Sequence, residues 1–107
     1  MVSTSSIKKQ VIEALEDIKA FDIVSLDVKK QTSIADFMVV ASASSTRQAK
    51  ALARNIKDKM NSAGIDIIGI EGESEGDWVL VDLGDIIVHI MTPTTRAYFN
   101  LEELWSN

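Results

Sequence analysis

The sequence predicts one α+β domain over residues 1–107, with a five-stranded mixed β-sheet and helices mainly on one face. Three observations predict this class. Apolar residues recur at helical spacing in 7–18 and in 45–63. Short apolar or alternating runs at 22–28, 36–42 and 65–72 are typical of strands. Residues 77–91, DWVLVDLGDIIVHIM, join two such runs through a glycine turn and predict a β-hairpin.

Two long helices are predicted from apolar stripes and capping residues. In the first, Ser5 or Ser6 is the expected N-cap. In the second, Ser45 and Gln48 form the capping box S-x-x-Q, and Gly64 is the expected stop. The first stripe comprises Ile7, Val11, Ala14, Leu15 and Ile18. The second comprises Ala49, Leu52, Ala53, Ile56, Met60 and Ala63.

Three strands are expected outside the hairpin. Residues 22–28 alternate, whereas 36–42, DFMVVAS, are nearly continuously apolar and fit a central strand covered on both faces over part of its length. Residues 65–72 form the third strand, and the charged segment 71–77, EGESEGD, leads into the hairpin. After the hairpin, Pro93 fits the first turn of a short helix capped by Thr92, and NLEELW gives a last turn or two.

The two faces of the hairpin differ in character. Its turn is Gly84-Asp85 or Leu83-Gly84, and both placements sort the side chains alike because strand side chains alternate. One face is aliphatic and is expected to be core: Val79, Val81, Leu83, Ile86, Val88 and Ile90. The other carries Trp78, Leu80, Asp82, Ile87, His89 and Met91.

The second hairpin face is either covered by a helix of the same chain or left for a partner. The two long helices can share the aliphatic face, which leaves only the short C-terminal helix for this one. Its mixture of Trp, Met, His and Asp is typical of interfaces. Together, Trp78, Leu80, Ile87 and Met91 are expected to form an apolar patch of a few hundred Å2. A patch of this size is unusual on the surface of a monomer. We therefore expect a partner-binding surface.

Composition excludes several classes of function. With no cysteine, the chain has no disulfide, thiolate zinc site or thiol nucleophile. The first residues, MVSTSSIKKQVIEAL, lack a continuous apolar run, so we expect no membrane span and a cytoplasmic protein, or an organelle protein already trimmed.

The net charge of −5 is unevenly distributed. Residues 1–60 hold ten of the eleven Lys and Arg against seven acids, a net of +3, and residues 61–107 hold one Arg against nine acids, a net of −8. The acidic half contains the hairpin. Because acidic surfaces repel phosphate, a basic protein is the expected partner of this half.

The residues that could bind a metal ion or act in catalysis are explained more simply by structural roles. His89 is the only histidine, and a zinc site would need carboxylates alone beside it, so a structural or interface role is favoured. Asp82 and Asp85 form a pair able to bind a divalent cation. Asp beside Gly is, however, ordinary turn chemistry, which is the favoured interpretation.

The second helix carries two further candidate features. Its approach, ASASSTRQ, has no glycine to wrap a phosphate, so capping is favoured over anion binding, with Ser44, Ser45 and Arg47 as possible contact residues. Arg47, Lys50, Arg54 and Lys57 form a basic stripe. A solvated face is its favoured interpretation, and a minor RNA contact is the alternative.

The block GIEGESEGDWVLVDLGDIIVHIM, followed by RAYFNLEELW, closely resembles the ribosomal silencing factor family (RsfS, the Iojap proteins). DIVSLDV and IADFMVVASASSTRQ fit the same pattern in order and spacing, so the resemblance covers about residues 7–105. Ala43 stands where the family often has Gly. The resemblance implies a nucleotidyltransferase-like fold without the catalytic Gly-Ser and paired-Asp pattern, and therefore no enzyme, cofactor or metal.

The resemblance also implies a partner and a mechanism. Such proteins bind the large ribosomal subunit through its protein L-fourteen at the intersubunit face, block subunit joining by their bulk and repress translation. The expected partner-binding residues are Trp78, Leu80, Asp82, Ile87, His89, Met91, Arg96 and Tyr98. Two alternatives are a nucleotidyltransferase-like enzyme that uses Asp82 and Asp85, and a homodimer that pairs the Trp78 face with its twin.

Overall fold

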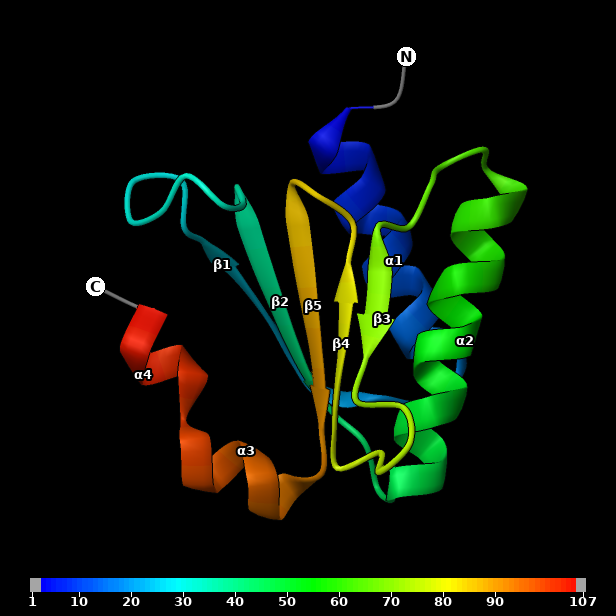
Figure 1. The fold of residues 1–107 in the computed structure, drawn as a ribbon, viewed down its shortest axis with the longest axis vertical. Coiled ribbons are helices and arrows are strands. Elements are labelled where there is room, and N and C mark those ends of the chain that lie inside the picture. Colours follow the sequence, from blue (N-terminus) through cyan, green and yellow to red (C-terminus); the bar gives the residue numbers. More distant parts are fainter. Residues whose placement is uncertain (1–2, 106–107) are drawn as a thin grey trace.

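The sheet is five-stranded and mixed, in the order β1-β2-β5-β4-β3 (Figure 1). A computed structural model describes residues 3–105 of the chain. The strands are β1 (Phe21–Asp27), β2 (Phe37–Ser42), β3 (Gly69–Glu71), β4 (Trp78–Asp82) and β5 (Ile86–Met91). The β2–β5 pair is parallel and the other three pairs are antiparallel. The predicted fold class is confirmed.

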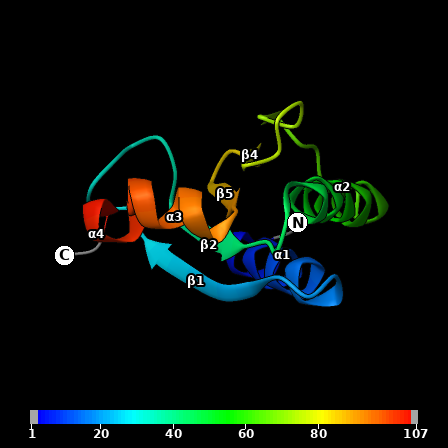
Figure 2. The same ribbon diagram turned by 90° about the horizontal axis from the view of Figure 1, so that it is seen from below.

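Helices lie on both sides of the sheet, the long ones on one side and the short ones on the other. Helices α1 (Thr4–Asp17) and α2 (Thr46–Ser62) are on one side, and α3 (Pro93–Phe99) and α4 (Leu101–Trp105) are on the other (Figures 1 and 2). The main core lies between the sheet and the long helices and includes Leu15, Leu52, Ile56, Val79 and Ile90, all with no exposed surface. Burial of these aliphatic side chains is the main stabilising contribution.

The hairpin has the predicted sorting of side chains. Asp82 pairs with Ile87, and the Leu83 N–H donates to the Ile86 carbonyl at 2.9 Å, so Gly84-Asp85 is the two-residue turn. Gly84 has φ +88°, a conformation that favours glycine. The Asp82 carboxylate accepts from the Gly84 N–H at 2.9 Å, which fixes the turn.

The ends of the long helices differ in detail from the prediction. Helix α1 is capped by Ser3, whose hydroxyl accepts from the Ser6 N–H, and not by Ser5 or Ser6. At α2 the Ser45 hydroxyl accepts from the Gln48 N–H at 3.1 Å as predicted. The Gln48 side chain, however, accepts from the backbone N–H of Ser44, so the reciprocal bond of the capping box is shifted by one residue.

The third strand is shorter than predicted. Residues 65–68 are irregular, and only three residues pair with β4. The Ile65 N–H donates to the Met60 carbonyl at 2.8 Å, which completes the end of α2, so this segment is used in the turn that leaves the helix. At the C-terminus the predicted helix is broken in two by Asn100, which adopts the left-handed conformation with φ +47°.

Candidate functional site

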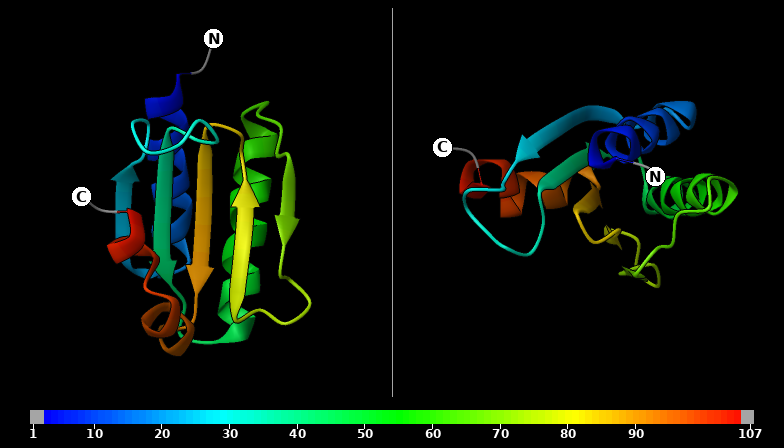
Figure 3. Two further views of the ribbon diagram at one scale, coloured as in Figure 1. Left: turned by 60° about the vertical axis from the view of Figure 1, so that its left-hand side comes forward. Right: turned by 90° about the horizontal axis from the view of Figure 1, so that it is seen from above.

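The second face of the hairpin keeps its six predicted residues together. Across β4 and β5 the pairs are Trp78–Met91, Leu80–His89 and Asp82–Ile87. Strand β2 extends the same face, because Met38, Val40 and Ser42 stand beside Ile87, His89 and Met91 in register. In the left view of Figure 3, α1 and α2 lie behind the strands, and α3 and α4 lie below and to one side of β5, leaving β4 open.

Part of this face is covered by the chain's own C-terminal helices, which corrects the expected surface. His89 is 6% exposed and Met91 1%, so neither presents its side chain to a partner in this structure. The short helix α3 packs over their end of the face and places Phe99 against Trp78. Trp78, Leu80, Asp82 and Ile87 remain partly exposed and form the accessible remainder.

Trp78 is fixed on two sides. Its indole N–H donates to His89 Nδ1 at 3.0 Å, and its ring lies 4.7 Å from that of Phe99, centroid to centroid. Tilted contacts at this distance are favourable for aromatic pairs. The side chain is therefore presented in one orientation, with part of its surface still accessible to solvent.

His89 is held neutral by its surroundings. Burial lowers the pKa of His89 from 6.5 to about 4, because desolvation disfavours the charged imidazolium. Nδ1 accepts from Trp78, which places the proton on Nε2, and that atom is buried without a hydrogen-bond partner in the described part of the chain. Within residues 3–105 no group of three or more His, Asp or Glu side chains is arranged to hold a metal ion.

A hollow of about 530 Å3 opens beside Trp78. Its apolar lining comes from Trp78, Leu80 and Phe99, and its acidic lining from Glu71, Glu75 and Asp77. The prediction from sequence missed Phe99, although RAYF places an aromatic residue one helical turn after Thr95. The arrangement combines apolar anchors with negative charge, which suits basic and partly apolar side chains.

The loop 71–77 that forms the acidic lining depends on glycine. Gly72 has φ +86°, and a Cβ at this position would lie 2.1 Å from the Trp78 carbonyl oxygen. Only glycine lets the loop pass so close to β4. Lys50 also ties the loop to α2, since its Nζ donates to the Ser74 carbonyl at 3.4 Å.

Arg96 and Tyr98 have different surroundings. The Arg96 guanidinium forms two bonds to Glu102, at 2.9 and 3.1 Å, and donates to the Ser42 hydroxyl at 2.8 Å. Its side chain is 11% exposed, so it anchors the C-terminal helices to the sheet instead of standing free. Tyr98 is 81% exposed and packs edge-on against Phe99 at 5.0 Å.

Asp82 also has a structural role within this surface, and the remaining candidate residues lie apart from it. Asp82 supports the hairpin turn, and Asp85 is exposed and accepts from the Thr4 hydroxyl at 3.4 Å. Of the basic stripe, Arg47, Arg54 and Lys57 are exposed on α2, behind the sheet, while Lys50 holds the 71–77 loop. None of the described helices is long and apolar enough to cross a membrane.

A family of ribosome-associated regulatory proteins matches nearly the whole chain. The family described as "Ribosomal silencing factor during starvation" matches residues 3–107. A ribosomal silencing factor RsfS of Chromobacterium violaceum is 52% identical over 99 residues, covering 92% of this chain and 81% of that protein. That of Bacillus subtilis is 40% identical and covers 99% and 90%. The chain therefore belongs to the ribosomal silencing factor (RsfS, Iojap) family.

Solved structures agree with this assignment. A crystal structure of a Chromobacterium violaceum protein superposes with a TM-score of 0.97 at 49% identity, covering 99% of this chain and 88% of that one. A Bacillus halodurans structure gives 0.87 at 35% identity and covers 95% of each chain. The chloroplastic Iojap protein of Zea mays is 32% identical over 95 residues, which cover 89% of this chain and 41% of that protein.

Proposed function

We propose that this protein binds the large ribosomal subunit through a ribosomal protein at the intersubunit face, L-fourteen, and blocks subunit joining, which represses translation. The observation that carries the proposal is the hollow beside Trp78, with Leu80 and Phe99 as apolar anchors and an acidic lining. A basic ribosomal protein is complementary to such a surface. The family membership supports the same reading.

The predicted partner-binding residues divide into two groups under this proposal. Trp78, Leu80, Asp82, Ile87 and Tyr98 are accessible and make the direct contacts. The other three act through them. His89 orients the Trp78 indole, and Met91 and Arg96 support the α3 end of the face. Trp at the centre of an interface is a frequent hot spot, which favours Trp78 as the main anchor.

The proposed mechanism is occlusion without chemistry, because a bound domain of this size occupies space that the small subunit needs. The basic stripe on α2 lies behind the sheet, so an RNA contact through Arg47, Arg54 or Lys57 is at most secondary to docking through the hairpin. The proposed partner is compatible with a cytoplasmic protein and with a trimmed protein of an organelle that has its own ribosomes. A homodimer that pairs the Trp78 face with its twin competes for the same surface.

Purified subunits on a sucrose gradient test the proposal. The protein is expected to reduce the joined-ribosome peak and to sediment with the large subunit. A triple variant, Glu71→Lys with Glu75→Lys and Asp77→Lys, changes only exposed residues of the hollow and is expected to lose both effects. The matched control reverses three exposed acids on the other layer, Glu13→Lys, Glu16→Lys and Asp58→Lys.

Two outcomes contradict the proposal. Normal subunit joining in the presence of excess wild-type protein would contradict the proposed mechanism. Equal loss of binding in both triple variants would contradict the assignment of the docking surface to the hollow beside Trp78. Sedimentation equilibrium of the same proteins tests the homodimer. The dissociation constant of a dimer through this face is expected to change in the first variant and to be unaffected by the control, and an unchanged dimer in both variants would place the contact elsewhere.

A further inference from the structure

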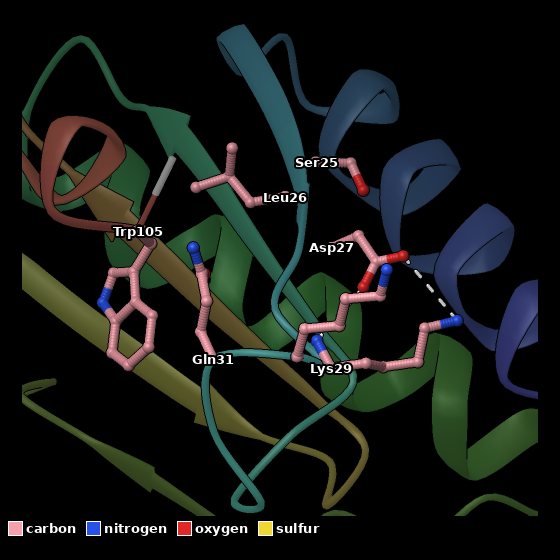
Figure 4. Close-up of a pocket in the computed structure, with 7 residues that line it drawn as sticks. Ser25, Leu26, Asp27, Lys29, Gln31 and Trp105 are labelled. Carbon is pink, nitrogen blue, oxygen red and sulfur yellow. Dashed lines mark hydrogen bonds and ion pairs between the residues drawn. The ribbon is translucent and has the colours of Figure 1, made fainter. Parts of the chain in front are cut away.

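A second hollow, of about 660 Å3, lies at the outer edge of β1. Its lining includes Leu26 and Asp27 of β1, Lys29, Lys30 and Gln31 of the loop that follows, and Trp105 of α4 (Figure 4). In the sheet, β2 and β5 stand between β1 and β4, so this hollow is separate from the one beside Trp78. Its volume is in the range of small-ligand sites, roughly 300–1,000 Å3.

The aromatic wall of this hollow is held from behind. Trp105 packs with Leu26 against the buried residues Val28, Met38 and Val40 on the second face of the sheet. The indole remains partly exposed where it lines the hollow. In Figure 4 the Gln31 side chain extends beside this indole, toward Leu26. A flat apolar ligand therefore has a supported aromatic surface to stack on.

Gln31 supplies hydrogen-bonding groups next to that surface. Its Oε1 is buried and has no hydrogen-bond partner in the described part of the chain. Because Oε1 is buried, a ligand in the hollow meets the Nε2 amide of the same side chain, which is not buried and can donate (Figure 4). An N–H donor beside an aromatic surface is complementary to the ring nitrogens and carbonyl oxygens on the edge of a nucleobase.

The cationic side chains of the hollow are unequal. Lys29 lies 3.7 Å from the Asp27 carboxylate and 5.1 Å from the Phe37 ring centroid, so its charge is partly used. Lys30 is exposed and forms no ion pair or cation–π contact among the described residues. Two lysines against one aspartate give this edge a positive balance in a chain whose net charge is −5. Lys30 is therefore available for an anionic group.

We propose that this hollow binds a nucleotide. The base stacks on Trp105, the Gln31 carboxamide bonds the base edge, and Lys30 contacts the phosphate. Stacking on an aromatic side chain combined with a basic contact to the backbone is how proteins hold single-stranded nucleic acid. The same chemistry is presented by a free nucleotide and by an unpaired nucleotide of RNA. The site is independent of the proposed docking surface.

Titration with adenosine monophosphate and with single-stranded hexa-adenylate, followed by NMR, tests the site and separates the sources. The indole N–H signals of Trp105 and Trp78 report separately on the two hollows. Saturable shifts of Trp105 and of residues 25–31, with Trp78 unmoved, are expected. Binding of the mononucleotide assigns the site to free nucleotides, and binding of the oligonucleotide alone assigns it to RNA.

Three variants make the test specific. Trp105→Ala is expected to weaken binding at least tenfold, because stacking is lost. Lys30→Ala leaves the core untouched and is expected to weaken binding severalfold and to reduce the salt slope by about one. Lys9→Ala, an exposed lysine of α1, is the matched control and is expected to bind normally. No shift of Trp105 with either ligand at millimolar concentration, or equal effects of the two lysine variants, overturns the proposal.

Discussion

The Trp78 side chain contributes both to the packing of the fold and to the accessible surface of the hairpin. It is partly exposed, yet it donates to His89 and stacks on Phe99, so the choice between core residue and docking residue is not exclusive. Removing it must affect the packing of α3 as well as the accessible surface. Its contribution to each is separable by substitution.

We predict that Trp78→Ala lowers the free energy of unfolding by about 2 kcal/mol, below the cost of a fully buried Trp, and also abolishes subunit binding. Trp78→Phe keeps an aromatic ring beside Phe99 but leaves His89 Nδ1 without its donor, at a cost of about 1 kcal/mol. Denaturant unfolding and gradient sedimentation measure the two effects. A Trp78→Ala protein that is folded and still binds fully would exclude the anchor role.

His89 makes stability depend on pH in a defined window. Its folded pKa is about 4, below the ordinary 6.5, so as pH falls through 6.5 the unfolded chain takes up a proton that the folded chain refuses. The contribution of neutral His89 to the free energy of unfolding is fully present above about pH 6.5. It is lost as pH falls toward 4, by at most about 1.4 kcal/mol per unit.

Unfolding in denaturant at pH 5.0 to 6.5 checks this prediction, because His89 is the only histidine of the chain. The wild type is expected to lose stability across the window. His89→Gln keeps an acceptor for Trp78 without titrating and is expected to give a flat profile. Parallel profiles for the two proteins would show that His89 is not the group responsible.

The sequence predicts the side-chain sorting but not the burial of His89 and Met91. Alternation along β4 and β5 is a local property, and the two faces follow from it, whereas the cross-strand pairs are set by the Gly84-Asp85 turn. Burial of the same residues depends on where α3 packs, and that depends on contacts such as Arg96 with Ser42, which are 54 residues apart. No pattern within the hairpin signals that cover.

At the scale of elements, α3 and α4 form an arm held to the sheet by few contacts. Neither helix has a fully buried residue. Arg96 links the arm to β2 through Ser42 and to the start of β1 through the Asp22 carbonyl, and it binds Glu102 within the arm. Helices with few buried contacts are the first to open locally.

We predict that Arg96→Ala frees the arm while the core persists. The loss of a partly buried bidentate pair is expected to cost about 2 kcal/mol of local stability. Hydrogen exchange should accelerate roughly thirtyfold for amides 96–105 and little for α2. Arg96→Lys is expected to behave similarly, because lysine lacks the planar fork. Uniform acceleration through α2 would mean that the arm is part of the global unit.

The elements that the sequence predicts well have local causes. The apolar run of β2 is buried from Met38 to Ser42 as expected for a central strand, and Gly64, with φ +75°, ends the second helix. The predicted range of the third strand is too long, because Ile65, Ile67 and Ile68 follow a strand-like pattern. Their backbone is used instead to close the helix turn and to meet Asp82. At residues 65–68, tertiary hydrogen bonding therefore overrides the strand-like pattern of the sequence.

At the scale of the whole molecule, acidic and basic side chains gather on different parts of the surface. The acids of 71–77 flank the hairpin face, while the exposed cations Arg47, Arg54 and Lys57 lie on α2 behind the sheet. A charged partner therefore meets a molecule with a preferred orientation. Such asymmetry acts mainly on the rate of association.

Replacing Glu73 and Glu75 by Gln is accordingly predicted to slow association with the large subunit and to flatten its salt dependence, with little change in dissociation. Both residues are exposed, so the fold should be unaffected. Stopped-flow or surface-based kinetics from 50 to 500 mM salt measure this, with Glu13→Gln and Glu16→Gln on α1 as the control. The control removes the same charge from the far side of the sheet and should slow association less. Equal slowing by both variants would mean that net charge, and not the placement of acids in the 71–77 loop, guides the encounter.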